Sequence, residues 1–431
     1  MPAIDVTWLG YLMAGVGLYY MLLFGLSLGV FRREPERQRA RRPFMALVVP
    51  AHNEELVIEE TLNALVRVRY DDFLVLVMND GSTDDTSPRA RAFEASGRVL
   101  VVDRPRAVSG RGKGAVLNHA FEILNELVDS GDPRLGGRRA DEVVVGVMDA
   151  DGVLDEHALE HVAPLFADSR VGGAQVGVRI LNARDGLLAR CQDMEFVGFS
   201  HLAQAARDRI GSVGLGGNGQ FTRLSALRSL GRPPWTDCLT EDLDLGLSLT
   251  RLGWRIRFCP SAWVAQQGVV TLRAWLKQRT RWAQGHYQCW AHFPRLLASR
   301  QAPLLTRIDL CVYLLFVTFV MFVTVNLVIT VAGALGLVWL SNDFLAFMPL
   351  GLPKNLATEL LGVGPVAIFL IRYQQQSRLR FRAWELPAFG ALFAAYAYLW
   401  AIATLLAWAR MLAGRGGWTK TARVEAGASV S

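Results

Sequence analysis

Residues 143–148, VVVGVM, form a short apolar run that is followed directly by Asp149-Ala150-Asp151. A run of this length and composition is typical of a strand buried on both faces of a sheet. Residues 56–68 have helical spacing and lie between two earlier runs of the same kind. Those earlier runs are MALVVP at 45–50 and FLVLVM at 73–78, and a shorter one follows at 99–102. Buried strands that alternate with helices predict an α/β domain with a mainly parallel sheet.

Polar residues follow three of these predicted strands. His52 and Asn53 come after the first strand, Asp80 after the second, and Asp149 and Asp151 after the last. In sheets of this kind ligands bind beyond the carboxyl ends of the strands. We therefore expect these side chains to gather at one edge of the sheet, around a ligand.

Apolar residues make up 52% of the 431 residues and are concentrated at the two ends of the chain. About 20 consecutive apolar residues are needed to cross a bilayer as a helix. One span is predicted near the N-terminus and three near the C-terminus, at Trp8–Val30, Val312–Leu340, Asn355–Ile371 and Leu386–Ala409. The predicted divisions are 1–43 for the first span and a basic segment, 44–294 for a cytosolic domain, 295–412 for the later spans and 413–431 for a polar tail.

The formal net charge is +7, and six arginines between Arg32 and Arg42 contribute to it directly after the first apolar run. Such a cluster orients a span with its basic side in the cytosol. We expect a multi-pass protein of the inner cell membrane whose middle domain faces the cytosol, with the side of the C-terminal tail left open. No recognition motif accompanies the charge, so nucleic acid is not an expected partner. The five cysteines have neither metal-site spacing nor a disulfide pattern.

Two further segments have both a structural and a functional interpretation. Thr240-Glu241-Asp242 precedes a helical pattern, where Thr240 could cap the helix and the acids could favour its dipole. The segment from Leu272 to Tyr287 predicts a basic helix with Trp275 and Trp282 one heptad apart. That helix could lie at a membrane interface without binding a substrate.

Six motifs occur in the order found in membrane-bound family 2 glycosyltransferases, and the chain resembles that family over about residues 44–294. The motifs are PAHNEE at 50–55, NDGSTDDT at 79–86, GKG with LNHA at 112–120, DAD at 149–151, TEDLDLG at 240–246 and QRTRW at 278–282. The layout is most similar to poly-β-1,6-N-acetylglucosamine and chitin-oligosaccharide synthases. The resemblance implies a GT-A type nucleotide-diphospho-sugar transferase domain.

The resemblance also implies roles for single residues. Asp242 is the expected catalytic base, because an inverting transferase needs one group to take the acceptor's proton. Glu241 is the second expected catalytic residue, and it is expected to position the acceptor or a neighbouring group. The expected donor-binding residues are Asn53, Glu55, Asp80, Lys113, Asp149 and Arg281, and the expected acceptor-binding residues are Trp282, Gln278 and Thr240.

Asp149 and Asp151 are predicted to hold Mg²⁺ or Mn²⁺, with Asp151 as the more direct ligand. Two carboxylates at the end of a buried strand repel each other, and a divalent cation that bridges diphosphate oxygens removes this repulsion. A cation there would also stabilise the leaving nucleoside diphosphate.

The function expected from these residues is an inverting β-glycosyltransferase that uses a UDP-sugar, with UDP-GlcNAc as the expected donor. Its product would be a polysaccharide that passes through the protein's own spans. One alternative is the transfer of a single sugar to a membrane lipid. Another is a non-catalytic membrane scaffold of an export complex with accessory subunits. No motif reports the identity of the sugar or the linkage.

Overall fold

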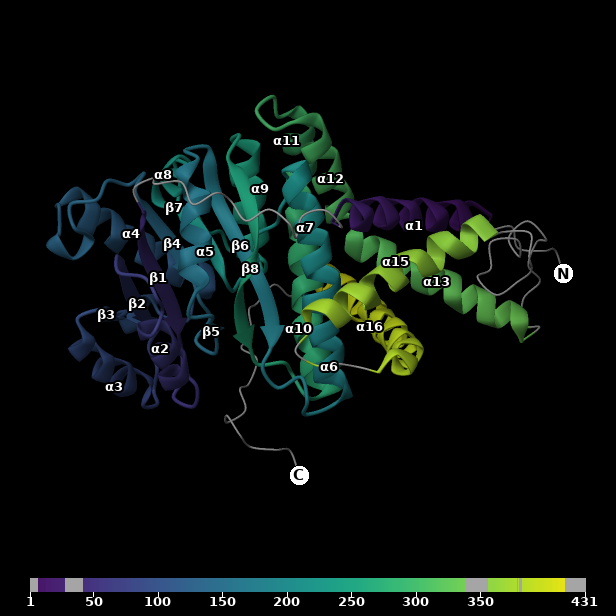
Figure 1. Cartoon of the computed structure of the whole chain (residues 1–431), viewed down its shortest axis with the longest axis horizontal. Coiled ribbons are helices and arrows are strands. Elements are labelled where there is room, and N and C mark those ends of the chain that lie inside the picture. The colour runs from purple at the N-terminus through teal and green to yellow at the C-terminus, as the bar shows by residue number, and fades with distance from the viewer. Residues whose placement is uncertain are drawn as a thin grey trace.

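The computed structural model describes residues 7–27, 42–335, 337, 356–377, 379 and 382–414. Most of the predicted arginine cluster and all of the chain beyond residue 414 lie outside the described residues. The described chain has a part built around a sheet and a part built from helices, and the helices α1, α13 and α15 extend away from the sheet (Figure 1).

Eight strands of the described residues form one sheet in the order β3-β2-β1-β4-β7-β6-β8-β5. Their bounds are Phe44–Ala51 (β1), Phe73–Asn79 (β2), Val99–Asp103 (β3), Val143–Val147 (β4), Val153–Leu154 (β5), Val171–Ile180 (β6), Gln220–Arg223 (β7) and Arg255–Gln266 (β8). The strands β3, β2, β1 and β4 are parallel neighbours, as predicted. The strand β7 is antiparallel to both β4 and β6, β6 is parallel to β8, and β5 is antiparallel to β8.

The sheet is therefore mixed, and the prediction of a mainly parallel sheet was wrong for its second half. The strands in that half carry no apolar run longer than four residues. The strand β7 has the sequence QFTR, and β6 contains Gly172, Gly173 and Gly177. A Cβ atom at Gly177 would lie 2.5 Å from the ring of Trp263, so the ring of Trp263 packs directly over the backbone of β6 at this glycine.

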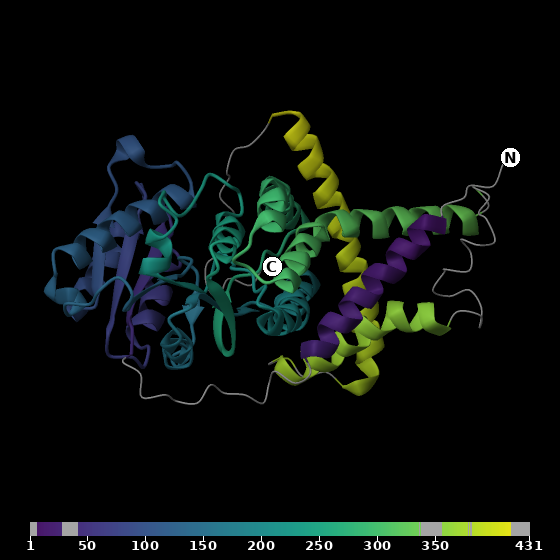
Figure 2. The same cartoon turned by 90° about the horizontal axis from the view of Figure 1, so that it is seen from above.

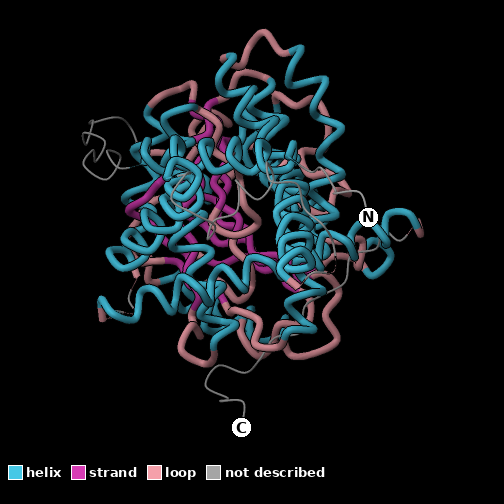
Figure 3. Tube along the Cα trace, turned by 90° about the vertical axis from the view of Figure 1, so that its right-hand side faces the viewer, coloured by secondary structure: helices cyan, strands magenta, loops and turns pink. Residues whose placement is uncertain are grey.

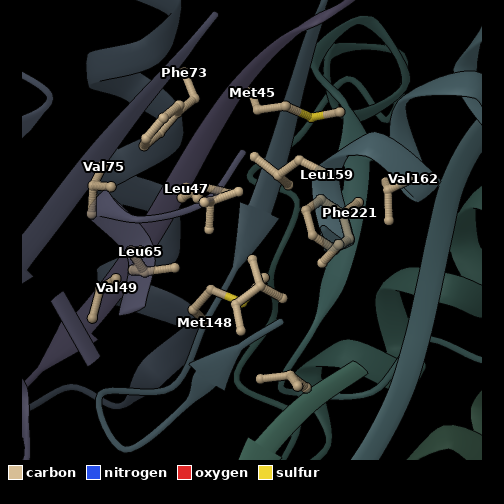
Figure 4. Packing of buried hydrophobic residues seen from close by; sticks show 14 of the residues in the cluster. Met45, Leu47, Val49, Leu65, Phe73, Val75, Met148, Leu159, Val162 and Phe221 are labelled. Atoms are coloured by element: carbon tan, nitrogen blue, oxygen red, sulfur yellow. The ribbon is translucent and has the colours of Figure 1, made fainter. Parts of the chain in front are cut away.

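The strands are buried on both faces because helices cover each side (Figure 3). Met45, Leu47 and Val49 of β1 belong to one core, whereas Ala46 and Val48 belong to the other. Figure 4 shows the first core, in which β1 packs with residues of β2, β4 and β7. The helices next to the strands are α2 (Ile58–Val66), α3 (Thr86–Arg91), α4 (Lys113–Asp129), α5 (Ala158–Val162), α8 (Leu224–Arg228) and α9 (Glu241–Arg251).

The helical part begins with α1 (Thr7–Ser27) and otherwise follows β6 and β8 in the chain. Its other members are α6 (Leu187–Asp193), the π-helix η6 (Met194–Ser200), α7 (His201–Ile210), α10 (Leu272–Gln288), α11 (Phe293–Ala298), α12 (Leu304–Leu314), α13 (Phe316–Ala334), α15 (Leu356–Gln376) and α16 (Leu386–Leu412). The helix α16 packs against α10, and α1 packs against α7 and α15 (Figure 2).

One helix of the described residues, α16, is long and apolar enough to cross a membrane. It corresponds to the last of the four predicted spans. The first predicted span, Trp8–Val30, lies in the helix α1 as far as Ser27, and its last three residues lie outside the described residues. Within α1, Gly15–Ser27 is a shorter apolar stretch. Helices α13 and α15 occupy parts of the second and third predicted spans. That these three helices cross a membrane stays a prediction.

A buried ion pair between α7 and α12 also holds α1, through a hydrogen bond from Tyr19. The Nε atom of Arg207 on α7 lies 3.1 Å from a carboxylate oxygen of Asp309 on α12, and their side chains are only 5% and 4% exposed. The hydroxyl of Tyr19 on α1 donates to the other oxygen of Asp309 at 2.9 Å. Ser212 donates a further hydrogen bond to Asp309 at 2.7 Å. The carboxylate of Asp309 is thus the centre of a network that holds three helices together.

Candidate active site

The turns that follow β1 and β2 are tied to each other by Asn53 and Glu55. The backbone of Asn53 has φ 53°, the left-handed conformation that asparagine tolerates better than most residues. Its side-chain oxygen accepts from the backbone N–H of Thr83 at 2.8 Å. A carboxylate oxygen of Glu55 accepts from the N–H of Asp85 at 3.1 Å. These two predicted donor-binding residues therefore shape the edge of the sheet where the donor was expected.

Asp80 follows β2 and is 5% exposed. One of its carboxylate oxygens accepts from the guanidinium of Arg104, and the other accepts from the N–H of Gly110 at 3.1 Å. The carboxylate thereby holds the loop that leads to α4. Sequence analysis missed Arg104, whose one signal is its position directly after β3.

Lys113 is the first residue of α4, and the N-cap residue before it, Gly112, has φ 94°. The ammonium of Lys113 donates to a carboxylate oxygen of Asp149 at 2.5 Å and to the carbonyl of Gly217 at 2.5 Å. Burial alone would lower the pKa of Lys113, but the charges of Asp149, Glu241 and Asp242 raise it above its ordinary value. The lysine is therefore a fixed cation among three carboxylates.

The turn that carries Asp149 and Asp151 is supported by Asn218. The side-chain oxygen of Asn218 accepts from the N–H of Asp149 at 3.2 Å, and its amide nitrogen donates to Gln266 at 2.9 Å. Asp151 is 4% exposed, and one of its oxygens accepts from the N–H of Gln267 at 3.4 Å. The sequence patterns did not predict that Asn218, in a glycine-rich segment, supports this turn.

Glu241 and Asp242 lie in the first turn of α9, whose N-cap residue is Thr240. Burial, together with the charge of Asp242, raises the pKa of Glu241 from 4.5 to about 7. Burial also raises the pKa of Asp242. Asp244 differs, because it bonds to His292 at 2.7 Å and to Thr236 at 3.0 Å and so has a structural role.

The raised pKa of Glu241 predicts how stability depends on pH. Between its ordinary pKa and about 7, the folded protein holds a proton that the unfolded chain has released. Stability should therefore fall as the pH rises from about 4.5 to about 7 and then level off. Glu241→Gln should remove this part of the decline, which thermal unfolding of both proteins at about pH 6 and about pH 8 would measure. Equal declines in the two proteins would contradict the assignment.

Gly217 lies between the lysine and the acids of α9. A Cβ atom at this position would lie 3.4 Å from the ammonium nitrogen of Lys113 and 3.4 Å from a carboxylate oxygen of Asp242. The expected donor lysine and the expected base are thus neighbours across one glycine.

Helix α10 packs tightly against the start of α9. A Cβ atom at Gly285 would lie 2.6 Å from the hydroxyl of Thr240, so only glycine permits this approach. The guanidinium of Arg281 donates to the carbonyl of Leu239 at 3.1 Å, which places its charge beside Glu241 and Asp242. The hydroxyl of Thr240 lies 3.7 Å from the sulfur of Cys289. Thr240 is thus a buried N-cap residue, although its side chain makes no capping hydrogen bond.

Two other predicted acceptor residues lie on α10 beside a buried arginine, Arg279. The ring of Trp282 is half-buried, and the guanidinium carbon of Arg279 lies 4.0 Å from its centroid. The side-chain oxygen of Gln278 accepts from Arg279 at 2.7 Å. Arg279 was not among the predicted site residues.

A cavity of about 160 Å³ opens beside Lys113. It is lined from one side by the glycine-rich loop before α4 and from the other by residues 236–239 and Glu241. The cavity therefore lies between the residues expected to bind the donor and those expected to bind the acceptor.

The carboxylates at the end of β4 fit a divalent cation that is completed by a substrate. The described residues contain no cluster of three or more metal-ligating side chains. Asp149 and Asp151 offer oxygen donors, and Mg²⁺ is commonly held by one or two carboxylates together with substrate phosphates. The donor set therefore suits a cation that binds with a diphosphate rather than one held by protein alone.

A family model described as "Glycosyltransferase like family 2" matches residues 42–285, more than half of the chain. The chain belongs to this family. The resemblance seen in the six motifs is thereby confirmed, and the chain is a family 2 glycosyltransferase.

Two relatives illustrate the range of proteins to which the family 2 domain is similar. A beta-monoglucosyldiacylglycerol synthase of Nostoc sp. is 33% identical over 252 residues, which cover 57% of this chain and 49% of the relative. A poly-beta-1,6-N-acetyl-D-glucosamine synthase of Staphylococcus aureus is 27% identical over 248 residues, which cover 57% of this chain and 55% of the relative. The chain spans about half the length of these relatives.

A solved mannosyltransferase from Pyrobaculum calidifontis has the same fold. Its structure, in complex with GDP-Man and Mn²⁺, matches with a TM-score of 0.56 and 18% identity, and the match covers 94% of this chain and 98% of that one. The expected GT-A type α/β fold is therefore confirmed, with a mixed sheet.

Proposed function

We propose that this protein transfers a single hexose, with inversion, from a UDP-sugar to a lipid in the membrane. The observation that carries the proposal is that Lys113, which bonds to Asp149 and to the carbonyl of Gly217, lies across Gly217 from Asp242. In this arrangement, Lys113 would offer positive charge to the diphosphate of the donor, and Asp242 would offer a carboxylate to the acceptor. The relatives named as lipid glucosyltransferases are more similar to this chain than those named as polysaccharide synthases.

The proposed reaction uses these residues in distinct roles. Asp242 accepts the proton of the acceptor hydroxyl while the hydroxyl oxygen attacks the anomeric carbon. The bond from that carbon to the diphosphate breaks, and the configuration inverts. Lys113 and Arg281 contribute positive charge that favours the departing diphosphate.

A divalent cation, Mg²⁺ or Mn²⁺, would be held by Asp151 and Asp149. When bound, it would neutralise charge on the leaving diphosphate. Asp149 would then be shared between the cation and Lys113, which bonds to it in this structure. The solved relative with the same fold binds Mn²⁺, which supports this part of the proposal.

The position and exposed apolar side chains of helix α16 favour an acceptor that lies in the membrane. A second cavity, of about 390 Å³, lies between α10 and α16, and its walls include Lys277, Thr280, Leu406 and Arg410. Apolar side chains of α16 such as Leu405 and Leu412 are exposed. A lipid could thus approach the site along α16 with its head group near α10. We propose that residues 44–294 form the catalytic unit on the cytosolic side, between membrane helices in 1–43 and 295–412.

The direct test uses the purified chain in lipid vesicles that contain diacylglycerol. Labelled UDP-Glc, UDP-GlcNAc and GDP-Man are added in separate reactions with Mn²⁺. The products are then extracted, and their masses are measured by mass spectrometry. We expect a lipid that carries one hexose, made from a UDP-sugar, with EDTA abolishing its formation and Mn²⁺ restoring it. Full transfer in excess EDTA would contradict the metal assignment, and the absence of transfer from every donor would contradict the proposal.

A second candidate is the processive polymer synthase expected from the sequence. The similarity to the poly-beta-1,6-N-acetyl-D-glucosamine synthase favours it. The same assay separates the two, because a polymer made from UDP-GlcNAc would form a ladder of sizes in the aqueous phase.

A further inference from the structure

The proposed reaction leaves unused a charged side chain that is completely buried. Arg279 on α10 is 0% exposed. Its guanidinium donates to a carboxylate oxygen of Glu195 on η6 at 2.6 Å. The same oxygen of Glu195 accepts from the hydroxyl of Tyr396 on α16. Through this one carboxylate, α10, the π-helix and α16 are joined.

Three half-buried aromatic rings surround the guanidinium. Its carbon lies 4.0 Å from the ring centroid of Trp282, 5.5 Å from that of Trp400 on α16 and 5.8 Å from that of Phe196 on η6. The ring centroids of Trp282 and Trp400 are 6.4 Å apart, and those of Trp282 and Phe196 are 6.2 Å apart. The rings therefore form one cluster, which we call the aromatic platform, and each ring comes from a different element.

A buried ion pair is a weak source of stability, because desolvation of the two charges offsets much of their attraction. An arginine beside tryptophan rings can have a different role. Its flat guanidinium stacks on a ring and fixes the orientation of that ring. Glu195 and Tyr396 in turn fix the guanidinium. The π-helix η6 also fits this interpretation, because such helices often mark functional sites.

We propose that the aromatic platform is one acceptor-binding surface, shared by α10, η6 and α16, and that Arg279 is its positioning residue. This inference rests on the proposed function, since it assumes that Trp282 contacts the acceptor. The ligand it takes is the glycerol and upper acyl region of a neutral glycerolipid, because tryptophan rings favour the boundary between lipid head groups and acyl chains. The helix α16 thus supplies part of the substrate site in addition to any membrane anchor.

The first test replaces a ring of the platform that lies outside the motifs. Trp400→Leu should raise the KM for diacylglycerol by roughly 3- to 10-fold, the worth of one aromatic contact, with kcat and UDP affinity nearly unchanged. Trp384→Leu is the matched control, because Trp384 is an exposed tryptophan that precedes α16 in the chain. Equal acceptor KM values for the two variants would overturn the proposal.

The second test addresses Arg279. Arg279→Lys keeps a positive charge beside Glu195 but loses the flat stacking surface, so it should raise the acceptor KM while thermal stability stays close to that of wild type. A fall in stability with an unchanged acceptor KM would show a structural role only and would overturn the positioning assignment.

A third readout does not depend on transfer. Brominated diacylglycerol should quench tryptophan fluorescence of the wild-type protein in vesicles more strongly than that of Trp400→Leu, with Trp384→Leu as the control. If the wild-type protein transfers no sugar but shows this difference, the proposed function fails and the platform stands. If it transfers sugar to lipid without this difference, the platform fails and the proposed function stands.

Discussion

Asp242→Asn is expected to lower sugar transfer by about 10²–10⁴-fold, the usual worth of a positioned general base. UDP affinity should change little, because Asp242 lies across Gly217 from Lys113, the proposed donor-binding lysine, and is proposed to act on the acceptor. Steady-state transfer rates and UDP binding measured on the same preparation would check both parts.

Asp151→Asn is the matched comparison for this variant. It removes the same charge at the end of β4 and should weaken metal-dependent UDP binding together with turnover. Near wild-type transfer by Asp242→Asn would show that the base is elsewhere, with Glu241 the next candidate.

The largest expected effect on stability comes from Asp309→Asn. This change would leave the buried guanidinium of Arg207 without its carboxylate, and the loss of one partner from a buried pair is worth about 3–5 kcal/mol. Tyr19 and Ser212 would also lose a charged acceptor. Thermal or chemical unfolding in detergent would show the loss.

The control for this prediction is Asp141→Asn. Asp141 pairs with Arg139, and their side chains are 54% and 76% exposed, so its removal should alter stability by less than about 1 kcal/mol. If the two variants unfold alike, the network around Asp309 does not anchor α1 as described.

The local features of the fold were predictable from the sequence. Four buried strands are marked by short apolar runs, and polar residues follow these runs. Such a pattern can be read from residues that are neighbours in the chain. The helix α10 was predicted at Leu272–Tyr287 and is found at Leu272–Gln288 because its periodicity is also local. The second half of the sheet was missed, because β7 and β5 are short and pair antiparallel with strands that are distant in the sequence.

The motifs pointed to candidate residues, some of which the structure brings together, but they did not predict the contacts between them. The motifs named Lys113, Asp149 and Asp242, but no pattern indicated that Gly217 lies between Lys113 and Asp242. Pairs such as Arg279 with Glu195, which are 84 residues apart, have no periodic or compositional signal. Only the packing of α10, η6 and α16 brings such residues together.

We expect an inverting transfer to a membrane lipid, with Asp242 as the base. Nuclear magnetic resonance of the lipid-phase product, made from an α-linked UDP-sugar, tests it most directly, because the coupling of the anomeric proton reports the configuration. A β-linked single hexose on diacylglycerol is the predicted result. An α-linked product, or label found only in a water-soluble polymer, would contradict the account.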